Sequence, residues 1–345
     1  EHSARTYPAK TAYIFGEASF TFAQINAMAN AVANGLQQLG LSRGDKVAIT
    51  CVNAPYFPVI YYGILKAGCI VVPLSVLLKK EEVAYHLSNS DAKAYFCFVG
   101  TPELPMAKEG YGGFNEAPAC EHFFVIMPQM TDASPIENTR TFGQFLNGQA
   151  YQFNTVLTNG DDTAVIIYTS GTTGKPKGAE LTHTNLLMNA YVSGNLFEAR
   201  HEDIFLTVLP MFHIFAMTVK MNLALLKGIT NVLLPRFDAE AAIRSIQKHG
   251  VTVFAGVPTM YWGLVNYTSD AFDVDNALRS LRVGVSGGAS LPVQVLMDFE
   301  TRFSVPVIEG YGMSEGSPVV TFNHLDKPRK AGSVGTPIWG VEVML

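Results

Sequence analysis

The sequence predicts an α/β protein with two packed, mostly parallel β-sheets flanked by helices. Two series of short apolar segments alternate with helical patterns along the chain, and the candidate strands are apolar throughout rather than at every second residue. Such strands are typical of parallel sheets that helices cover on both faces. The length of 345 residues exceeds what one ordinary hydrophobic core supports, so we expect more than one subdomain.

The first series begins with a helix at 22–39. Thr21 can cap this helix with Gln24 three residues later, apolar residues recur along one face, and Gly40 follows its end. Further elements of this series are expected as strands at 46–51, 69–73 and 93–99 and as helices at 56–66 and 81–87.

A second alternating series follows a looser region. Residues 100–160 are rich in Gly, Pro and Asn and contain one apolar strand, 123–127, so we expect a surface excursion there. Beyond it we expect strands at 163–168, 204–208, 230–234, 252–255, 281–285 and 305–309, and helices at 183–196, 238–249 and 291–302. This order predicts a first α/β subdomain over 1–160 and a second over 161–325. Residues 339–345 alternate like a half-buried strand and then stop, which indicates a fragment of a longer protein.

Composition and charge exclude several functional classes. Hydrophobic residues make up 48% of the chain, charged residues 15%, and the formal net charge is -5. A nucleic-acid-binding protein would show a basic face, so we expect no nucleic-acid partner. The four cysteines lie far apart without C-x-x-C spacing, which is typical of buried free thiols in a reducing compartment. The apolar runs are too short to span a bilayer, and we expect a cytoplasmic protein.

The segment YTSGTTGKPKG, residues 168–178, has the composition of a phosphate-binding loop. It holds three glycines, four Ser or Thr hydroxyls and two lysines, so backbone amides, hydroxyls and ammonium groups can all meet an anion. It differs from the G-x-x-x-x-G-K-[ST] loop of NTPases, because Pro176 follows Lys175. We therefore expect a freestanding loop that holds polyphosphate. Further glycine-rich segments, 284–288 and 310–312, also follow expected strands, where open α/β sheets bind ligands.

Four motifs in order carry a resemblance to a known family. The loop at 168–178 resembles the phosphate-binding signature of the adenylate-forming enzymes, and it is followed by Pro210-Met-Phe-His213, by Ser286-Gly-Gly-Ala-Ser-Leu-Pro292 and by Glu309-Gly-Tyr-Gly-Met-Ser-Glu315. The chain resembles in particular the medium- and long-chain fatty acyl-CoA synthetases and the 4-coumarate-CoA ligases, over nearly its whole length. The resemblance implies the large N-terminal domain of such an enzyme, with residues 326–345 as the start of a distorted β-barrel, truncated before the C-terminal lid domain.

The resemblance implies an ATP-dependent carboxylic acid–CoA ligase that forms an acyl-adenylate and releases pyrophosphate. Its co-substrates are ATP and coenzyme A, with Mg²⁺ on the phosphates. By resemblance, Tyr311 stacks on adenine, Ser314 replaces the usual threonine as a donor to the α-phosphate, and Glu315 binds Mg²⁺ with the hydroxyl of Thr169. The ATP-binding set that the resemblance implies is Thr169, Ser170, Gly171, Thr172, Thr173, Gly174, Lys177, Gly288, Ala289, Glu309, Gly310, Tyr311, Gly312 and Ser314.

The reacting centre and the acyl pocket follow from the same resemblance. His213, Lys177 and Glu315 are the expected catalytic residues, with His213 positioning the substrate, because a carboxylate nucleophile is already ionised at pH 7. The segment 211–217 offers no acidic partner for an amino-acid ammonium, so we expect an apolar acid. The expected acyl-binding set is Met211, Phe212, His213, Phe215, Met217, Gly256, Val257, Gly287 and Met313.

Several alternatives stay open from the sequence. An acyl-AMP ligase that loads a carrier protein, an aryl-CoA ligase of the 4-coumarate type and a nucleotide- or acyl-binding module without catalysis share these motifs. A peripheral membrane association that supplies fatty acid, the oligomeric state and the acyl chain length also stay open. Family members carry a later ribose-binding aspartate, a hinge and a C-terminal lysine, none of which lies within residues 1–345. We therefore expect poor turnover from this fragment alone.

Overall fold

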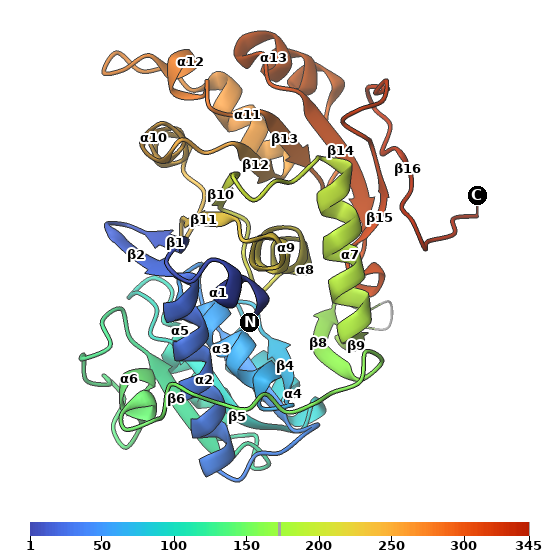
Figure 1. The fold of residues 1–345 in the computed structure, drawn as a ribbon. Coiled ribbons are helices and arrows are strands. Elements are labelled where there is room, and N and C mark those ends of the chain that lie inside the picture. Colours follow the sequence, from blue (N-terminus) through green and yellow to red (C-terminus); the bar gives the residue numbers. More distant parts are fainter. Residues whose placement is uncertain (172–173, 345) are drawn as a thin grey trace. The chain divides into compact units, whose positions relative to one another are not determined.

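The computed structural model describes residues 1–171 and 174–344. The chain forms two compact units, each built around its own sheet. We call Ala23–Thr184 the loop unit, and Glu1–Phe22 together with Asn185–Leu345 the pocket unit. The helices and strands of both are labelled in Figure 1.

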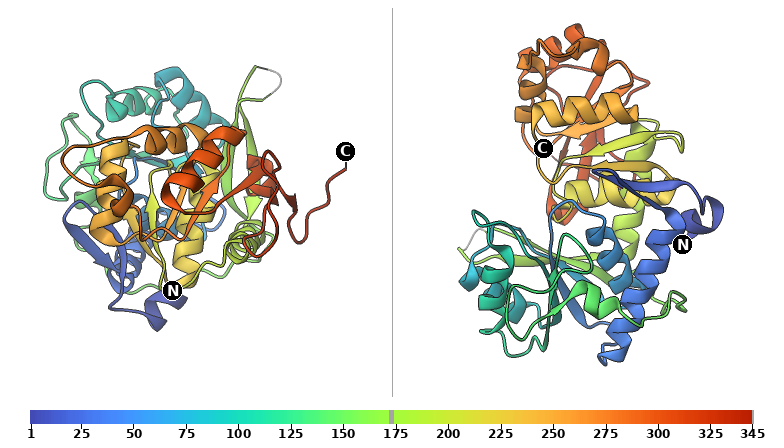
Figure 2. Two further views of the ribbon diagram at one scale, coloured as in Figure 1. Left: turned by 90° about the horizontal axis from the view of Figure 1, so that it is seen from above. Right: turned by 90° about the vertical axis from the view of Figure 1, so that its left-hand side faces the viewer.

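The loop unit contains a seven-stranded sheet in the order β7-β6-β5-β3-β4-β8-β9. Neighbouring strands run parallel except for the last pair, β8 and β9, which form an antiparallel hairpin (Figure 2). The strands are β3 (Lys46–Thr50), β4 (Ile70–Pro73), β5 (Ala92–Phe98), β6 (His122–Ile126), β7 (Arg140–Thr141), β8 (Thr163–Thr169) and β9 (Lys177–Thr182). The helices are α2 (Phe22–Gln38), α3 (Tyr56–Lys66), α4 (Lys80–Asn89), α5 (Met106–Phe114) and α6 (Phe142–Leu146).

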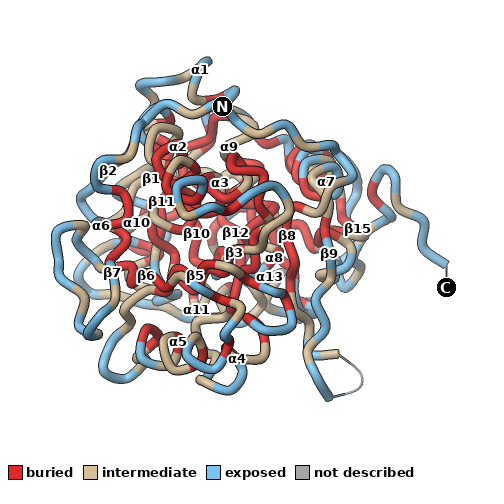
Figure 3. The backbone as a smooth tube through the Cα atoms, turned by 90° about the horizontal axis from the view of Figure 1, so that it is seen from below, coloured by how far each residue is buried: buried red, intermediate tan, exposed pale blue. Residues whose placement is uncertain are grey.

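Helices cover both faces of this sheet, as the apolar strands predict. Side chains of α4 and α5 share one hydrophobic cluster with β3, β5 and β6. On the other face, Phe96 of β5 packs edge-on against Phe142 and Phe145 of α6. Helices α2 and α3 approach closely at Gly63, where a Cβ atom would lie 2.4 Å from the side chain of Val32. The strands are mostly buried, whereas the connecting loops are mostly exposed (Figure 3).

The pocket unit contains a nine-stranded sheet in the order β16-β15-β14-β13-β12-β10-β11-β1-β2. From β14 to β1 in this order, all neighbouring strands run parallel. At the two edges, β2 is antiparallel to β1, β15 to β14 and β16 to β15. The strands are β1 (Thr11–Phe15), β2 (Ala18–Thr21), β10 (Ile204–Thr207), β11 (Thr230–Leu233), β12 (Val253–Gly256), β13 (Val283–Ser286), β14 (Val307–Gly312), β15 (Val319–Phe322) and β16 (Thr336–Pro337).

Two hydrophobic clusters flank this sheet. On one face lie α7 (His183–Leu196), α8 (Ile214–Ala216), the π-helical segment η1 (Met217–Asn222) and α9 (Leu223–Lys227). The other face packs against α10 (Ala239–His249), α11 (Pro258–Asn266), α12 (Val274–Ala277) and α13 (Val293–Phe303). The unit also contains the N-terminal helix α1 (His2–Thr6) and a 3₁₀ turn, η2 (Ser314–Gly316). This arrangement, like that of the loop unit, confirms the predicted α/β class with two mostly parallel sheets.

A buried lysine lies inside the pocket unit. Lys220 of η1 is 1% exposed; its Nζ donates to the carbonyl oxygen of Val253 at 3.2 Å and lies 4.2 Å from the ring centroid of Phe205. Burial disfavours the charged ammonium and lowers the pKa of Lys220 to about 7, although Asp203 opposes this shift. The four cysteines are all buried and free, as predicted.

Residues 1–22, expected in the first subdomain, belong to the pocket unit, because β1 pairs with β11. The structure differs from the expected boundaries in two further places. Residues 161–184 belong with the first series and not the second, because β8 pairs with β4 and β9 pairs with β8. The expected strand at 339–345 is wrong for the described part, 339–344, which forms a turn and irregular backbone. Gly340 with a φ of 82° interrupts the extended run. The described residues from 326 onward contain one two-residue strand, β16, and no closed barrel.

Candidate functional site

The phosphate-loop candidate lies at the tip of the β8–β9 hairpin. Thr169 and Lys177 face each other in the antiparallel register, so the loop leads into a strand that the sequence did not predict, and not into a helix. Gly171 has a φ of 63°, and a Cβ atom there would lie 2.6 Å from the carbonyl oxygen of Lys175. The loop therefore requires glycine at this position. Lys175 and Lys177 are exposed, and Thr172 and Thr173 lie outside the described residues.

Helix α4 holds the base of this loop. The hydroxyl of Tyr85 donates to the carbonyl oxygen of Pro176 at 2.8 Å. The hydroxyl of Tyr168 donates to Asn89 Oδ1 at 2.7 Å, and the ring of His86 lies edge-on to Tyr168 with centroids 4.3 Å apart. Burial lowers the pKa of His86, so this histidine is a neutral packing partner. The described part of the loop is thus attached to helix α4 at its base.

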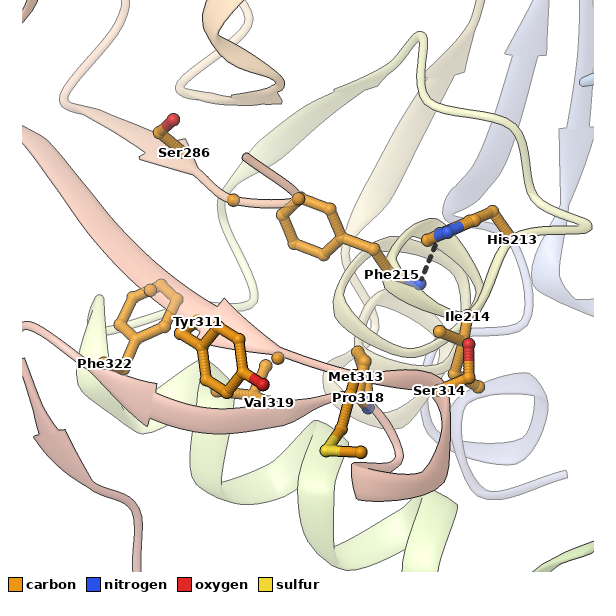
Figure 4. A pocket seen from close by; sticks show the side chains of 14 residues that line it. His213, Ile214, Phe215, Ser286, Tyr311, Met313, Ser314, Pro318, Val319 and Phe322 are labelled. Carbon is orange, nitrogen blue, oxygen red and sulfur yellow. Dashed lines mark hydrogen bonds between the residues drawn. The ribbon is translucent and has the colours of Figure 1, made fainter. Parts of the chain in front are cut away.

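The pocket unit contains a pocket of about 180 Å³ at the carboxyl ends of its central strands (Figure 4). Three of the four predicted motifs contribute to its walls. None of the described residues that line it carries an Asp, Glu, Lys or Arg side chain. The lining residues are His213, Ile214, Phe215, Ser286, Gly287, Gly288, Gly310, Tyr311, Gly312, Met313, Ser314, Pro318, Val319 and Phe322.

Tyr311 lines this pocket and is 50% exposed. The tyrosine lies on β14 opposite Thr321 of β15. The glycines on either side of Tyr311 are closely packed and leave no empty space. A Cβ atom on Gly310 would lie 2.1 Å from the ring of Phe322, and one on Gly312 would lie 2.4 Å from the carbonyl oxygen of Pro318. These glycines let β15 close against β14, which fixes the tyrosine from behind.

Three other residues of the expected ATP-binding set, Gly288, Ala289 and Glu309, differ in their relation to the pocket. Gly288, with a φ of 82°, lines the pocket, whereas Ala289 is exposed and does not. Glu309, which we expected to contact ATP, is 5% exposed, and its carboxylate accepts a hydrogen bond from the amide of Leu291 at 2.8 Å. Its side chain therefore orders the 287–291 turn instead of lining the pocket.

The metal-ligand candidate lies just beyond the pocket. Ser314 lines the pocket and Glu315 follows it on the exposed turn η2. The turn is closed by a hydrogen bond from the amide of Met313 to the carbonyl oxygen of Pro318 at 2.9 Å. The described part of the chain holds no cluster of three His, Cys, Asp or Glu side chains. This fits Mg²⁺ on phosphate oxygens, which needs few protein carboxylates.

His213 is held as a neutral hydrogen-bond donor. It caps α8, and its Nδ1 accepts from the amide of Phe215 at 3.3 Å (Figure 4), which assigns the ring proton to Nε2. The side chain is open to the pocket, but the surrounding atoms desolvate it and lower its pKa. Its Nε2 proton is then available to a carboxylate oxygen in the pocket.

The predicted acyl-binding residues do not all reach the pocket. His213, Phe215, Gly287 and Met313 line it, and the Phe215 ring lies 3.3 Å from the Cβ position of Gly287. The others are not among its lining residues, and two of them, Met211 and Met217, have 0% exposure. The remaining three are Phe212, Gly256 and Val257. The predicted sets missed the lining residues Ile214, Ser286, Pro318, Val319 and Phe322. Ser286 stands within a motif and Ile214 directly after one, whereas Pro318, Val319 and Phe322 follow the last motif by three to seven residues.

Comparison with known proteins decides the family. The model of the family described as "AMP-binding enzyme" matches residues 1–345. The chain belongs to the AMP-binding enzyme family. The predicted resemblance to adenylate-forming enzymes is therefore confirmed.

Curated relatives and solved structures agree with this membership. The chain is 32% identical to a long-chain-fatty-acid–CoA ligase of Bacillus subtilis, covering 97% of this chain and 62% of the relative. It is also 32% identical to a crotonobetaine/carnitine–CoA ligase of Salmonella arizonae, covering 97% and 64%. Among solved structures, the anthranilate CoA ligase AuaEII in complex with anthranoyl-AMP matches with a TM-score of 0.88 at 26% identity, covering 98% of this chain and 64% of that one.

The N-terminal domain of FACL13 from Mycobacterium tuberculosis matches with a TM-score of 0.85 at 27% identity, covering 98% of this chain and 81% of that one. The chain thus spans less than two thirds of the length of the curated relatives named above. In the described residues, no helix is both long and apolar enough to cross a membrane.

Proposed function

We propose that this chain is the nucleotide- and acid-binding part of an ATP-dependent carboxylic acid–CoA ligase that works through an acyl-adenylate. One observation carries the proposal. An uncharged pocket, walled by the segments around 213, 286–288 and 310–314, lies at the carboxyl ends of parallel strands, in a chain that the AMP-binding family model matches throughout. Ligands of open α/β sheets bind at this edge.

Each residue then has a definite task. The amides and hydroxyls of Thr169–Gly174, with Lys177, bind the phosphates that leave as pyrophosphate. Tyr311 stacks on the adenine, with Gly288 on the other side, and Ser314 donates to the α-phosphate. His213 orients the acid through its Nε2 proton. The acid's carboxylate attacks the α-phosphorus, the bond to the β-phosphate oxygen breaks, and pyrophosphate leaves with that electron pair.

Glu315, assisted by Thr169, would hold Mg²⁺. The metal, when bound, neutralises charge on the phosphate oxygens. Coenzyme A is the proposed acceptor of the acyl group. We place the protein in the cytoplasm. Its proposed partners are small molecules.

We propose an apolar acid, in first place a medium- or long-chain fatty acid, as the substrate. The pocket has no carboxylate that could pair with an ammonium group, and its walls include Ile214, Phe215 and Met313. A flat aryl acid is the second candidate, because the Phe215 ring lines the same pocket and an aromatic ring can stack on a flat acid.

The test is ATP–pyrophosphate exchange in the full-length protein, with a panel of fatty, aryl and amino acids. An adenylate-forming enzyme exchanges label only with its own acid present, whereas a non-catalytic binding module gives no exchange with any acid. Adding coenzyme A or a phosphopantetheinyl carrier protein after adenylation then identifies the acceptor. Exchange with amino acids alone would contradict the proposed substrate.

A further inference from the structure

A buried asparagine on helix α7 reaches the turn that follows β14. Asn189 is 6% exposed. Its Nδ2 group donates to the carbonyl oxygens of Gly316 and Val319 at 3.1 and 2.9 Å, and its Oδ1 accepts from the amide of Val319 at 3.2 Å. Figure 1 shows α7 running alongside β14 and β15.

The carboxamide of Asn189 is fully used. Its Oδ1 also accepts from the hydroxyl of Ser193, one turn along α7, at 3.4 Å. Both donors and both acceptor positions of the side chain therefore have partners. The two carbonyls that receive the donors fix which way the amide faces, because the reversed orientation would place oxygen against oxygen.

The asparagine acts on Val319 as a neighbouring strand would. It pairs with both the N–H and the C=O of this residue, which begins β15. The third bond, to Gly316, reaches the end of the turn Ser314–Gly316. The four-residue segment 316–319 is thus tied at both ends to a helix, and Ser317 between them has a φ of 73°.

This segment determines where two proposed ligands of ATP and Mg²⁺ lie. Ser314 and Glu315 sit on the turn that Asn189 fastens at Gly316, and Pro318, also within the segment, accepts from the amide of Met313. The asparagine itself is not among the residues that line the pocket. Its effect on bound phosphate would therefore pass through the turn.

We propose that Asn189 is a positioning residue that sets the turn Ser314–Gly316 for phosphate and Mg²⁺, an inference that depends on the function proposed above. Asn189→Asp keeps the shape and the acceptor, removes both donors and sets a carboxylate against two carbonyl oxygens. Asn189→Ala removes the same bonds without adding a charge. Asn189 itself does not line the pocket; of its two backbone partners, Val319 lines the pocket and Gly316 does not.

The control is a second buried asparagine in the same unit. Asn231 of β11 is 0% exposed; its Oδ1 accepts from the Thr207 hydroxyl at 2.6 Å and its Nδ2 donates to the carbonyl oxygen of Lys220 at 3.3 Å. Asn231→Asp therefore imposes the same chemical change at a site that does not contact the turn.

The experiment measures ATP–pyrophosphate exchange in the full-length protein as a function of Mg²⁺ and of acid. In Asn189→Asp and Asn189→Ala we expect the Mg²⁺ concentration at half-maximal rate and the KM for ATP to rise about tenfold. The KM for the acid should stay within about twofold of wild type, which corresponds to roughly 0.4 kcal/mol. Asn231→Asp should leave all three constants within that range.

A double mutant tests the route through Glu315. If Asn189 acts by placing this carboxylate, Asn189→Ala should raise the Mg²⁺ concentration at half-maximal rate and the KM for ATP much less in a Glu315→Gln background than in wild type. Hydrogen exchange at the amides of 314–319 adds a readout that needs no turnover, and both variants at 189 should accelerate it about tenfold or more.

The outcomes separate the two proposals. Variants at 189 that fold and show wild-type constants for Mg²⁺ and ATP would overturn the positioning role and leave the proposed function intact. An equal rise of the constants for Mg²⁺ and ATP in Asn231→Asp would show that the effect comes from a general loss of stability. This result would also overturn the positioning role of Asn189. A wild-type protein without exchange for any acid would contradict the proposed function, and the positioning role would fall with it.

Discussion

The hydroxyl of Tyr85 donates to the carbonyl oxygen of Pro176 and so ties helix α4 to the phosphate-loop candidate. Tyr85→Phe removes this one bond while it keeps the ring. We expect the KM for ATP to rise about three- to tenfold, because a single hydrogen bond contributes roughly 0.5–1.5 kcal/mol. Steady-state kinetics over ATP concentration measures this rise.

A matched tyrosine supplies the control. Tyr56 in the same unit donates from its hydroxyl to the carbonyl oxygen of Pro128 at 2.9 Å, away from the loop. Tyr56→Phe loses the same kind of bond and should leave the KM for ATP unchanged. Equal effects of the two substitutions would contradict a special role of Tyr85.

Two glycines of the loop should respond differently to alanine. Gly171 and Gly174 both have positive φ, at 63° and 91°, so alanine strains either position. At Gly171 the new Cβ would also meet a backbone oxygen, that of Lys175, at 2.6 Å; a Cβ on Gly174 would have no described atom within 4 Å apart from its chain neighbours. We expect Gly171→Ala to weaken MgATP binding about tenfold to a hundredfold and Gly174→Ala to weaken it less. Calorimetric titration compares the two, and the reverse order would refute this account of the loop.

Glu315→Gln tests the metal ligand. The change removes a negative charge from an exposed side chain, so the free energy of unfolding without ligand should change by less than about 0.5 kcal/mol. The adenylation rate at limiting Mg²⁺ should fall by about a hundredfold or more, as expected when a metal loses its carboxylate. Normal adenylation by the variant at low Mg²⁺ would show that another group holds the metal.

Lys220 should make stability depend on pH. Its pKa is about 7 in the folded protein against an ordinary value of 10.5. Below pH 7 the folded and unfolded states both hold the proton, and the full cost of burying the charge is present. Between pH 7 and 10 the unfolded state holds more protons, so stability rises with pH, by up to about 1.4 kcal/mol per pH unit.

Lys220→Met removes this dependence. The variant should be more stable than wild type at pH 6.5, and its advantage should shrink as the pH rises to 9.5. Urea denaturation at both pH values measures the two differences. A constant difference between the proteins would show that Lys220 does not change its charge on unfolding.

Chain length is the sharpest test of the substrate. An apolar pocket gains about 0.8 kcal/mol for each buried methylene, which is up to roughly fourfold in kcat/KM per carbon until the pocket is full. Phe215→Ala enlarges the pocket and should move the optimum to longer acids. A series that falls from butyrate upward, with cinnamate-like acids preferred, would favour the aryl-CoA ligase alternative.

The sequence predicted the elements whose signals are local. The helices at 56–66 and 183–196 have the expected bounds. Strand β9 was missed, since Lys177–Thr182 is mostly exposed and polar, and only pairing with β8 makes it a strand.

The candidate site was predicted in its motifs but not in its supports. Glu309 stands within a motif, and only the fold shows that its carboxylate turns to the amide of Leu291. Asn189 lies in the middle of a helix, and its partners, Gly316 and Val319, are more than a hundred residues away along the chain. No local pattern can predict a role that depends on such a distant contact.

The parallel pairing of β1 with β11 has a consequence for biosynthesis. Tyr13 lies opposite Asn231 in this sheet, so the ribosome adds more than two hundred residues before the first strand can find its neighbour. At ordinary translation rates this takes roughly ten to forty seconds. Throughout that time Ala23–Thr184 can fold as it emerges, while the β1–β2 hairpin has no sheet to join. The edge of β1 that pairs with β11 therefore stays open during this time, and an open strand edge is a site at which other chains can add.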